Sequence, residues 1–281
     1  SYRVGRIRRD INLLLSILPF EADWFAAHGM AQVQYVGHPL TGQVRGAILA
    51  GGGATRFGGR PKGLEPVGGI RILDRLVDAF LEALGTLPLL IANDSGAPSW
   101  RPGLRVLPDV HPGAGALGGI LTAVGAAPEP VVCVAWDMPF VPAALLHRLA
   151  QELDRADAVL PAGGGRRGVE PMCAGYGPAC RPAIEAAIAQ GDLRAIAFHS
   201  AVRTCILPAE TVAAFGDPST LFFNVNSQDD LTQARGVELR AATDYNISLA
   251  ELARAQGTLL DQYSVVVEVP GKRFVPWWAR F

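Results

Sequence analysis

Between residues 43 and 240, short β-rich runs alternate with stretches that have the periodicity of amphipathic helices, and this alternation restricts the fold more than any other feature. Predicted strands cover residues 45–50, 87–92, 104–107, 131–135, 158–160 and 170–176, and predicted helices cover 73–84, 118–126, 143–153 and 182–190. The pattern predicts an α/β domain with a mostly parallel sheet between helices. In such a sheet, ligands bind at the carboxyl ends of the strands.

Composition excludes several classes of function. The chain has 281 residues, 49% of them hydrophobic and 18% charged, which is enough apolar material for a sizeable core. Its formal charge is −1, from 25 Lys and Arg against 26 Asp and Glu, so no large basic surface is available to hold nucleic acid. The apolar runs are far shorter than the about 18 residues that a membrane helix needs. We therefore expect neither a nucleic-acid nor a membrane partner.

The cysteines and the N-terminal sequence indicate in which cellular compartment the protein is expected. Cys133, Cys173, Cys180 and Cys205 form no C-x-x-C pair, so we expect neither a disulfide framework nor a structural zinc site. This pattern favours a reducing, cytoplasmic location. No signal-peptide pattern opens the chain, and because it starts at Ser1 without a Met, we expect an incomplete N-terminus.

A glycine-rich segment, residues 49–63, follows the first predicted strand and precedes a helix. Its length exceeds that of an ordinary strand-to-helix connection. Glycines allow backbone N–H groups to approach a phosphate chain, and Arg56, Arg60 and Lys62 supply positive charge. The segment is neither a Walker loop nor a G-x-G-x-x-G fingerprint. A phosphate-binding loop is therefore favoured over the alternative, a flexible surface loop.

Two acidic residues directly follow predicted strands. Asp109 lies between a strand and a glycine turn that leads into a helix, a position that suits a ribose, base or metal contact; the alternative is a turn or capping role. Asp137 ends a fully apolar run, where a carboxylate needs a partner, and Mg²⁺ is a natural one. Its alternative role is a helix cap. Asn224 and Asn226 either contact a substrate or cap the helix that follows them.

Six motifs, taken together and in order, resemble those of the molybdenum cofactor guanylyltransferase family, the MobA-like nucleotidyltransferases, over about residues 44–236. They are L-A-G-G, R-x-G-G-x-x-K-G, P-D…G-x-L-G-G, D-x-P-F, E-P-x-C-A and F-N-V-N. The resemblance implies a Rossmann-like three-layer α/β sandwich of the nucleotide-diphospho-sugar transferase type. It also implies the reaction: GMP is transferred from Mg·GTP to molybdenum-molybdopterin, which gives the guanine dinucleotide cofactor and pyrophosphate. Molybdoenzyme apoproteins or their chaperones become candidate partners, and Mg²⁺ is the expected cofactor.

The same resemblance assigns site residues. The nucleotide-binding set that it implies is Leu49, Ala50, Gly51, Gly52, Lys62, Asn93, Asp109 and Asp137, with Asp137 as the Mg²⁺ ligand. We expect Lys62 and Arg56 to offset triphosphate charge, so that Lys62, Arg56 and Asp137 carry the catalysis. Trp136 departs from the family, whose members often have a small residue or Cys at this position.

The flanks fall outside this resemblance. Residues 3–40 resemble an internal fragment of lipid A disaccharide synthases, a piece too short for sugar transfer. We expect an N-terminal extension at residues 1–42, a nucleotidyltransferase domain at 43–240 and a C-terminal tail of unknown role at 241–281.

Other functions stay open on the sequence alone. A cytidylyltransferase acting on the same pterin would use the same loop and aspartates. Another nucleotidyltransferase, such as one that acts on sugar 1-phosphates, usually has L-A-A-G-x-G-T-R in this loop. A non-catalytic nucleotide-binding adaptor would bind nucleotide without turnover, and a lipid-linked glycosyltransferase is suggested by the first 42 residues alone.

Overall fold

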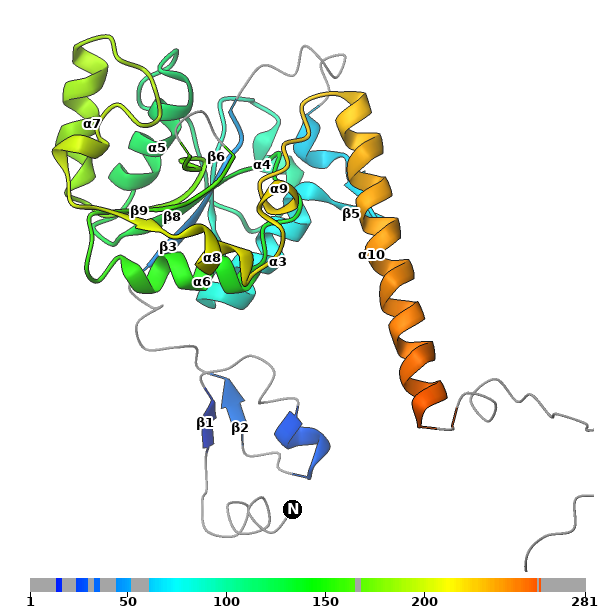
Figure 1. Cartoon of the computed structure of the whole chain (residues 1–281). Coiled ribbons are helices and arrows are strands. Elements are labelled where there is room, and N and C mark those ends of the chain that lie inside the picture. The colour runs from blue at the N-terminus through cyan, green and yellow to red at the C-terminus, as the bar shows by residue number, and fades with distance from the viewer. Residues whose placement is uncertain are drawn as a thin grey trace, which may run out of the picture. The chain divides into compact units, whose positions relative to one another are not determined.

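A computed structural model describes residues 14–16, 24–29, 33–35, 44–51, 61–164, 168–256 and 258. The chain forms two compact units, residues 1–234 and residues 235–281. The first contains a seven-stranded, mostly parallel sheet covered by helices, and this confirms the predicted α/β sandwich (Figure 1).

The strands and helices of the sandwich are as follows. The seven strands are β3 (Arg45–Leu49), β6 (Leu89–Ile91), β7 (Val106–Leu107), β8 (Val131–Ala135), β9 (Ala158–Pro161), β10 (Cys173–Tyr176) and β11 (Thr204–Leu207). The helices are α3 (Ile72–Leu84), α4 (Ala97–Trp100), α5 (Gly115–Gly125), α6 (Ala143–Glu152), α7 (Cys180–Ala189), α8 (Ala209–Ala213) and α9 (Pro218–Leu221), with short 3-10 turns η3 (Lys62–Leu64) and η4 (His199–Ala201). A small antiparallel hairpin, β4 (Pro66–Val67) and β5 (Ile70–Arg71), follows η3.

The sheet has the strand order β11-β9-β10-β8-β3-β6-β7. Strand β10 runs antiparallel to both of its neighbours, β8 and β9, and every other pairing in this sheet is parallel. Because β8, β3, β6 and β7 are parallel and adjacent, their carboxyl ends meet at one edge of the sheet. The connections that leave this edge carry the polar residues singled out above.

Helices cover both faces of the sheet, with α3 and α6 packed together on one face and α5 and α7 on the other (Figure 1). Side chains along β8 alternate between the two cores: Val132 and Val134 face the α3 and α6 side, whereas Val131 and Cys133 face the α5 and α7 side. All four are fully buried. A strand buried on both faces explains the unbroken apolar run that precedes Asp137.

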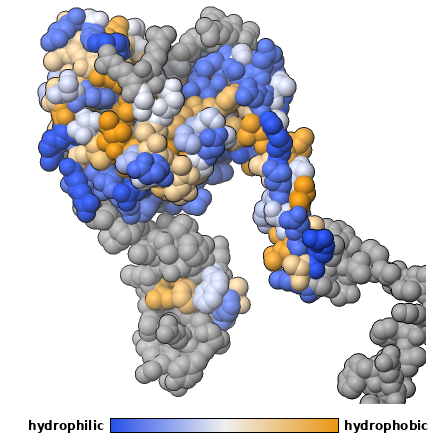
Figure 2. Space-filling model, in the orientation of Figure 1, coloured by the Kyte–Doolittle hydropathy of each residue, from blue (hydrophilic) through white to orange (hydrophobic). Residues whose placement is uncertain are grey.

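Smaller elements complete the described residues. Strands β1 (Leu14–Ser16) and β2 (Val33–Tyr35) pair in parallel, and residues 24–27 form a helical turn. Helix α10 (Gln228–Ala255) begins in the first unit, where Leu231 and Ala234 are buried, and continues into the second, where Leu239 is exposed. Apolar and polar side chains alternate on the surface of this helix (Figure 2). Across the residues for which coordinates are described, no helix is long and apolar enough to span a bilayer.

Candidate active site

A pocket of about 430 Å³ lies at the carboxyl ends of β3, β6 and β8. The first turns of α5 and the loop before it form a second wall, and Met172 and Asn224 contribute from later in the chain. Five of the residues predicted for nucleotide binding line this pocket: Leu49, Gly51, Asn93, Asp109 and Asp137. The sheet topology therefore brings together residues that are up to 88 positions apart in the sequence.

Lys62 and Asp137 form an ion pair beside the pocket. The Lys62 ammonium group donates a hydrogen bond to Asp137 Oδ2 and a second, 3.1 Å long, to Asn226 Oδ1. Both side chains of the ion pair are largely buried, with exposed fractions of 14% for Lys62 and 12% for Asp137. At this depth the attraction between the charges is screened less than on the surface, so the pair holds the turn η3 against the end of β8.

The segment at residues 224–226 lies against this ion pair. The backbone N–H of Val225 donates to the backbone carbonyl of Asp137 over 2.8 Å, and Asn226 accepts from Lys62. The helix that follows is capped by Ser227, whose hydroxyl accepts from the N–H of Asp230. Asn226 therefore contacts a predicted catalytic group and does not cap α10 through its side chain, and Asn224 lines the pocket.

Asp137 does not cap the helix that follows it. Helix α6 begins at Ala143, its N-cap residue is Pro142, and no side chain accepts a hydrogen bond at that cap. One carboxylate oxygen of Asp137 is bound by Lys62, whereas the other, Oδ1, is buried without a hydrogen-bond partner among the described residues. A buried carboxylate oxygen with no partner is costly, so it marks a position where a bound cation or donor would be stabilised.

Asn93 and Asp109 form a second polar pair on the opposite side of the pocket. Asn93 Nδ2 donates to Asp109 Oδ2, and the backbone N–H of Asp109 donates to Asn93 Oδ1, each over 2.8 Å. The N-cap residue of α5 is Ala114, with no side-chain cap, so Asp109 is not a helix cap. The pairing leaves Asp109 Oδ1 on the side of Gly119, a residue that lines the pocket.

The loop that carries Asp109 is fixed to helix α5 by Thr122. The Thr122 hydroxyl accepts from the N–H of Val110 and donates to the carbonyl of Gly118, both over 2.9 Å, and its side chain is buried. Gly113 and Gly115, with φ of 92° and 59°, turn the chain into the helix in conformations that side-chain-bearing residues rarely adopt. The pocket wall here is therefore backbone, which lets a ligand approach closely.

A divalent cation fits the Asp137 side of the pocket only if the substrate supplies ligands. Within the described ranges, no cluster of three or more His, Cys, Asp or Glu is arranged to bind a metal ion. Mg²⁺, however, is commonly held by one or two carboxylates together with phosphate oxygens and water. The unpartnered Oδ1 of Asp137 is one such carboxylate oxygen, so the residues present fit a nucleotide-bound Mg²⁺.

Glu170 adds negative charge near Asp137. Burial raises the pKa of Glu170 above its ordinary value, a hydrogen bond from the Met172 backbone opposes this rise, and the charge of Asp137 contributes a smaller increase. A bound cation at Asp137 would reduce this repulsion. The electrostatics of this end of the pocket therefore also favour a cation.

The structure brings together most of the predicted site residues, with three exceptions. Gly52 and Arg56, like Arg60, lie outside the described residues. Ala50 is buried in the core next to the pocket, and its N–H donates to the carbonyl of Ile91. Sequence reasoning missed the roles of Thr122 and Met172; the G-x-L-G-G motif was the available signal for the α5 wall, because repeated glycines at the start of a helix indicate a close backbone approach.

Comparison with known proteins supports both resemblances seen in the motifs. The family model of the MobA-like NTP transferase domain matches residues 46–203. The probable molybdenum cofactor guanylyltransferase of Pelotomaculum thermopropionicum is 34% identical over 194 residues, which cover 69% of this chain and 92% of that protein. The molybdenum cofactor guanylyltransferase of Mesorhizobium japonicum is 35% identical over 203 residues, which cover 68% of this chain and 94% of that protein.

A solved structure and a second family model complete the comparison. The structure of molybdopterin-guanine dinucleotide biosynthesis protein A from Archaeoglobus fulgidus superimposes with a TM-score of 0.60 at 25% identity and covers 70% of this chain and 99% of that one. The family model of lipid-A-disaccharide synthetase matches residues 1–47. Both resemblances expected from the motifs are thereby confirmed.

Proposed function

The chain belongs to the MobA-like NTP transferase family, and we propose that it transfers GMP from Mg·GTP to molybdopterin carrying molybdenum. The products are the guanine dinucleotide form of the cofactor and pyrophosphate. The observation that carries this proposal is the Lys62–Asp137 ion pair beside a glycine-lined pocket at the carboxyl ends of parallel strands. The similarity to named guanylyltransferases over two thirds of the chain supports the choice of substrates.

In this reaction a phosphate oxygen of the acceptor attacks the α-phosphorus of GTP. A new oxygen–phosphorus bond forms to the GMP unit while the bond between the α-phosphorus and the bridging oxygen to the β-phosphate breaks, and pyrophosphate leaves with that oxygen. Both partners are anionic, so the enzyme's task is to neutralise charge and align the reacting atoms, and no nucleophilic side chain is needed.

The chain's own residues divide this task. Lys62, released from Asp137 when nucleotide binds, neutralises phosphate charge, and Arg56 does the same from the glycine-rich loop. Asp137 would hold Mg²⁺, which supplies Lewis-acid polarisation of the phosphates when bound. On the other side, Asn93 orients Asp109 toward the nucleoside, while Leu49, Gly51 and Gly52 contact the nucleotide and Ala50, whose N–H is bonded to Ile91, supports them from the core.

Location and partners are part of the same proposal. All four cysteines are free thiols in the structure, and three of them are buried, which agrees with a reducing cytoplasm. Molybdoenzyme apoproteins or their chaperones would receive the finished cofactor.

The position of a radioactive label tests the proposal. With purified chain, Mg²⁺, molybdenum-loaded molybdopterin and GTP, a label on the α-phosphate is expected in the pterin product, and a label on the γ-phosphate is expected in pyrophosphate. Lys62→Ala serves as the matched variant and should lose both products. If the α-label stays with free nucleotide although GTP binds, the chain is an adaptor and the proposal is wrong.

A further inference from the structure

We propose that Trp136 is a positioning residue that fixes Lys62 relative to Asp137, an inference that rests on the proposed function of these two groups. Trp136 precedes Asp137 in the sequence and is 3% exposed.

Trp136 and Gly63 form the contact behind the ion pair. A Cβ atom placed on Gly63 would lie 2.3 Å from Cε3 of the Trp136 indole, well inside van der Waals contact. The two segments 62–63 and 136–137 therefore meet twice: once through the charges of Lys62 and Asp137, and once through the backbone of Gly63 and the ring of Trp136. Because the ring fills the space under Gly63, it sets how close Lys62 comes to the end of β8.

The Trp136 indole also packs against a second aromatic ring, that of Trp100. Trp100 stacks on Trp136 with ring centroids 5.1 Å apart and an interplanar angle of 21°. A stacked aromatic pair of this kind adds to the stabilisation that the burial of the two rings already provides. Trp136 therefore cannot shift without disturbing a second buried aromatic residue, since Trp100 is 7% exposed.

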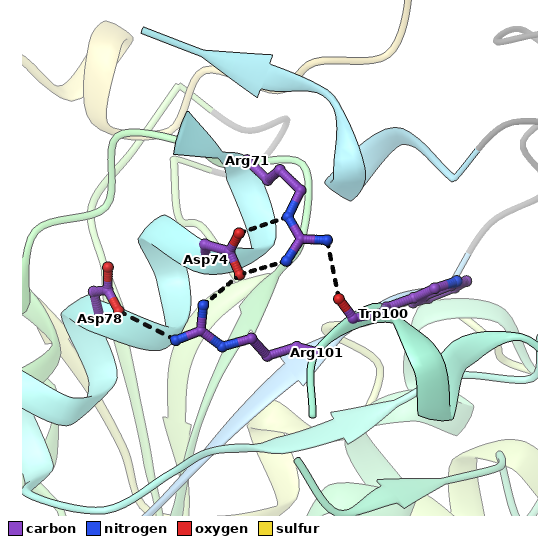
Figure 3. A network of polar contacts seen from close by, with 5 residues as sticks. All are labelled: Arg71, Asp74, Asp78, Trp100 and Arg101. Atoms are coloured by element: carbon purple, nitrogen blue, oxygen red, sulfur yellow. Dashed lines mark hydrogen bonds and ion pairs between the residues drawn. The ribbon is translucent and has the colours of Figure 1, made fainter. Parts of the chain in front are cut away.

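A charged network in turn holds Trp100 (Figure 3). Arg71 donates from Nη1 to the backbone carbonyl of Trp100 over 3.0 Å and forms a two-point contact with Asp74 of 2.6 and 3.0 Å. Arg101 donates to the same Asp74 carboxylate over 2.7 Å. The network joins the start of α3 to the end of α4, so the support of Trp136 extends into the rigid part of the fold.

Burial opposes the ionisation of Asp74, but the hydrogen bonds and charges of Arg71 and Arg101 outweigh it and hold the pKa of Asp74 below its ordinary value. Asp74 therefore stays charged at neutral pH, and the network is intact under the conditions in which transfer would be assayed.

A compensation experiment tests this arrangement. Gly63→Ala places a methyl group against the indole and should displace Lys62, whereas Gly63→Ala combined with Trp136→Leu removes the obstructing ring. We expect Gly63→Ala to lower kcat about tenfold or more with a smaller change in the KM for GTP, because misalignment affects the chemical step more than binding. The double variant should recover part of that loss. Gly236→Ala, with no atom within 4 Å of the added methyl group, is the control and should behave as wild type.

Two single variants of Trp136 separate the ring from the rest of the side chain. Trp136→Phe keeps an aromatic ring under Gly63 and should retain most of the activity, whereas Trp136→Leu should lower kcat. Thermal unfolding of each variant identifies any that fail to fold. If Gly63→Ala fails to fold, the difference in kcat between Trp136→Phe and Trp136→Leu still tests whether the aromatic ring positions Lys62.

A second readout needs no turnover. Lys62 is largely buried in its ion pair, so acetic anhydride should acetylate it slowly in the wild type. Acetylation of Lys62 should be faster in Gly63→Ala and in Trp136→Leu. It should be slower again in Trp136→Phe and in the double variant. Mass spectrometry measures the rate at Lys62 itself. Equal labelling rates in all variants, or a double variant no more active than Gly63→Ala, would overturn the inference. If Lys62 of the wild type is acetylated slowly, as expected, but the wild type transfers no GMP, the proposed function is refuted instead.

Discussion

Asn93 binds Asp109 through two hydrogen bonds of 2.8 Å, one to its carboxylate and one from its backbone N–H. The two residues follow the neighbouring parallel strands β6 and β7, so the pairing joins two connections at the pocket edge. One side chain thereby fixes both the position and the rotation of the Asp109 carboxylate. This is the arrangement expected of a group that must meet a ligand at a defined angle.

We expect Asn93→Ala to raise the KM for GTP about tenfold while kcat changes less. The reason is that one of the two lost hydrogen bonds has the charged Asp109 carboxylate as its acceptor and is worth about 1.5–3 kcal/mol. Steady-state kinetics of pyrophosphate release measure the effect. Asp94→Asn is the control, since Asp94 lies next in the chain and its side chain accepts from the N–H of Gly96 through an oxygen that Asn retains. Equal KM values for the two variants would show that Asn93 has no part in nucleotide binding.

The Thr122 hydroxyl gives a second prediction, on the wall formed by α5. Thr122→Val keeps the shape of the side chain but leaves the N–H of Val110 without its acceptor, at a cost of about 1–3 kcal/mol. We expect Tm to fall by roughly 2–4 °C per kcal/mol and the KM for GTP to rise. Thr122→Ser restores the hydroxyl and should behave as wild type in both measurements. If Ser lowers Tm and raises the KM while Val does not, the methyl group and not the hydrogen bond is what matters.

Asp137→Asn should lower kcat about 100-fold or more without loss of secondary structure, because it removes the carboxylate proposed to hold Mg²⁺ and the partner of Lys62. The remaining activity should need a higher Mg²⁺ concentration, which a titration of rate against Mg²⁺ would detect. Circular dichroism checks the fold. Glu129→Gln breaks an exposed ion pair with Arg45 and should leave kcat unchanged. An Asp137→Asn enzyme with wild-type kcat would remove Asp137 from the mechanism.

His199 predicts how stability depends on pH. Burial lowers the pKa of His199 from 6.5 to about 4, and its Nε2 has no hydrogen-bond partner within the described part of the chain. The unfolded chain therefore binds a proton that the folded protein rejects, so this contribution to stability is present above pH 6.5 and is lost as the pH falls toward 4. Tm measured between pH 7 and pH 4 should decline less steeply for His199→Gln. Parallel pH profiles of the two proteins would contradict this.

Much of the fold followed from periodicity and burial. The strand predicted at residues 131–135 is observed there, because a strand buried on both faces is an unbroken apolar run bounded by polar residues. The helix predicted at 118–126 begins earlier, at Gly115, because glycines are poor helix formers and obscured its first turn. Strand β11 and the length of α10 were not predicted. The first is a short edge strand with only Leu207 buried, and the second carries no continuous apolar stripe.

For the site, the sequence indicated which residues matter but not their partners. Asp109 and Asp137 were recognised because each follows a strand, yet the pairing of Asp109 with Asn93 depends on which strands are neighbours in the sheet. The bond from Lys62 to Asn226 joins positions 164 residues apart, so no local pattern encodes it. The roles of the individual residues, and the division of the chain at residues 42 and 240, stay predictions.

The most direct test of guanylyl transfer is a competition between nucleotides. The purified chain is incubated with Mg²⁺, molybdenum-loaded molybdopterin and equal concentrations of GTP and CTP, and mass spectrometry identifies the dinucleotide formed. Our account predicts the guanine dinucleotide in large excess, with one pyrophosphate released for each. The cytosine dinucleotide as the main product, or no dinucleotide despite bound nucleotide, would contradict it.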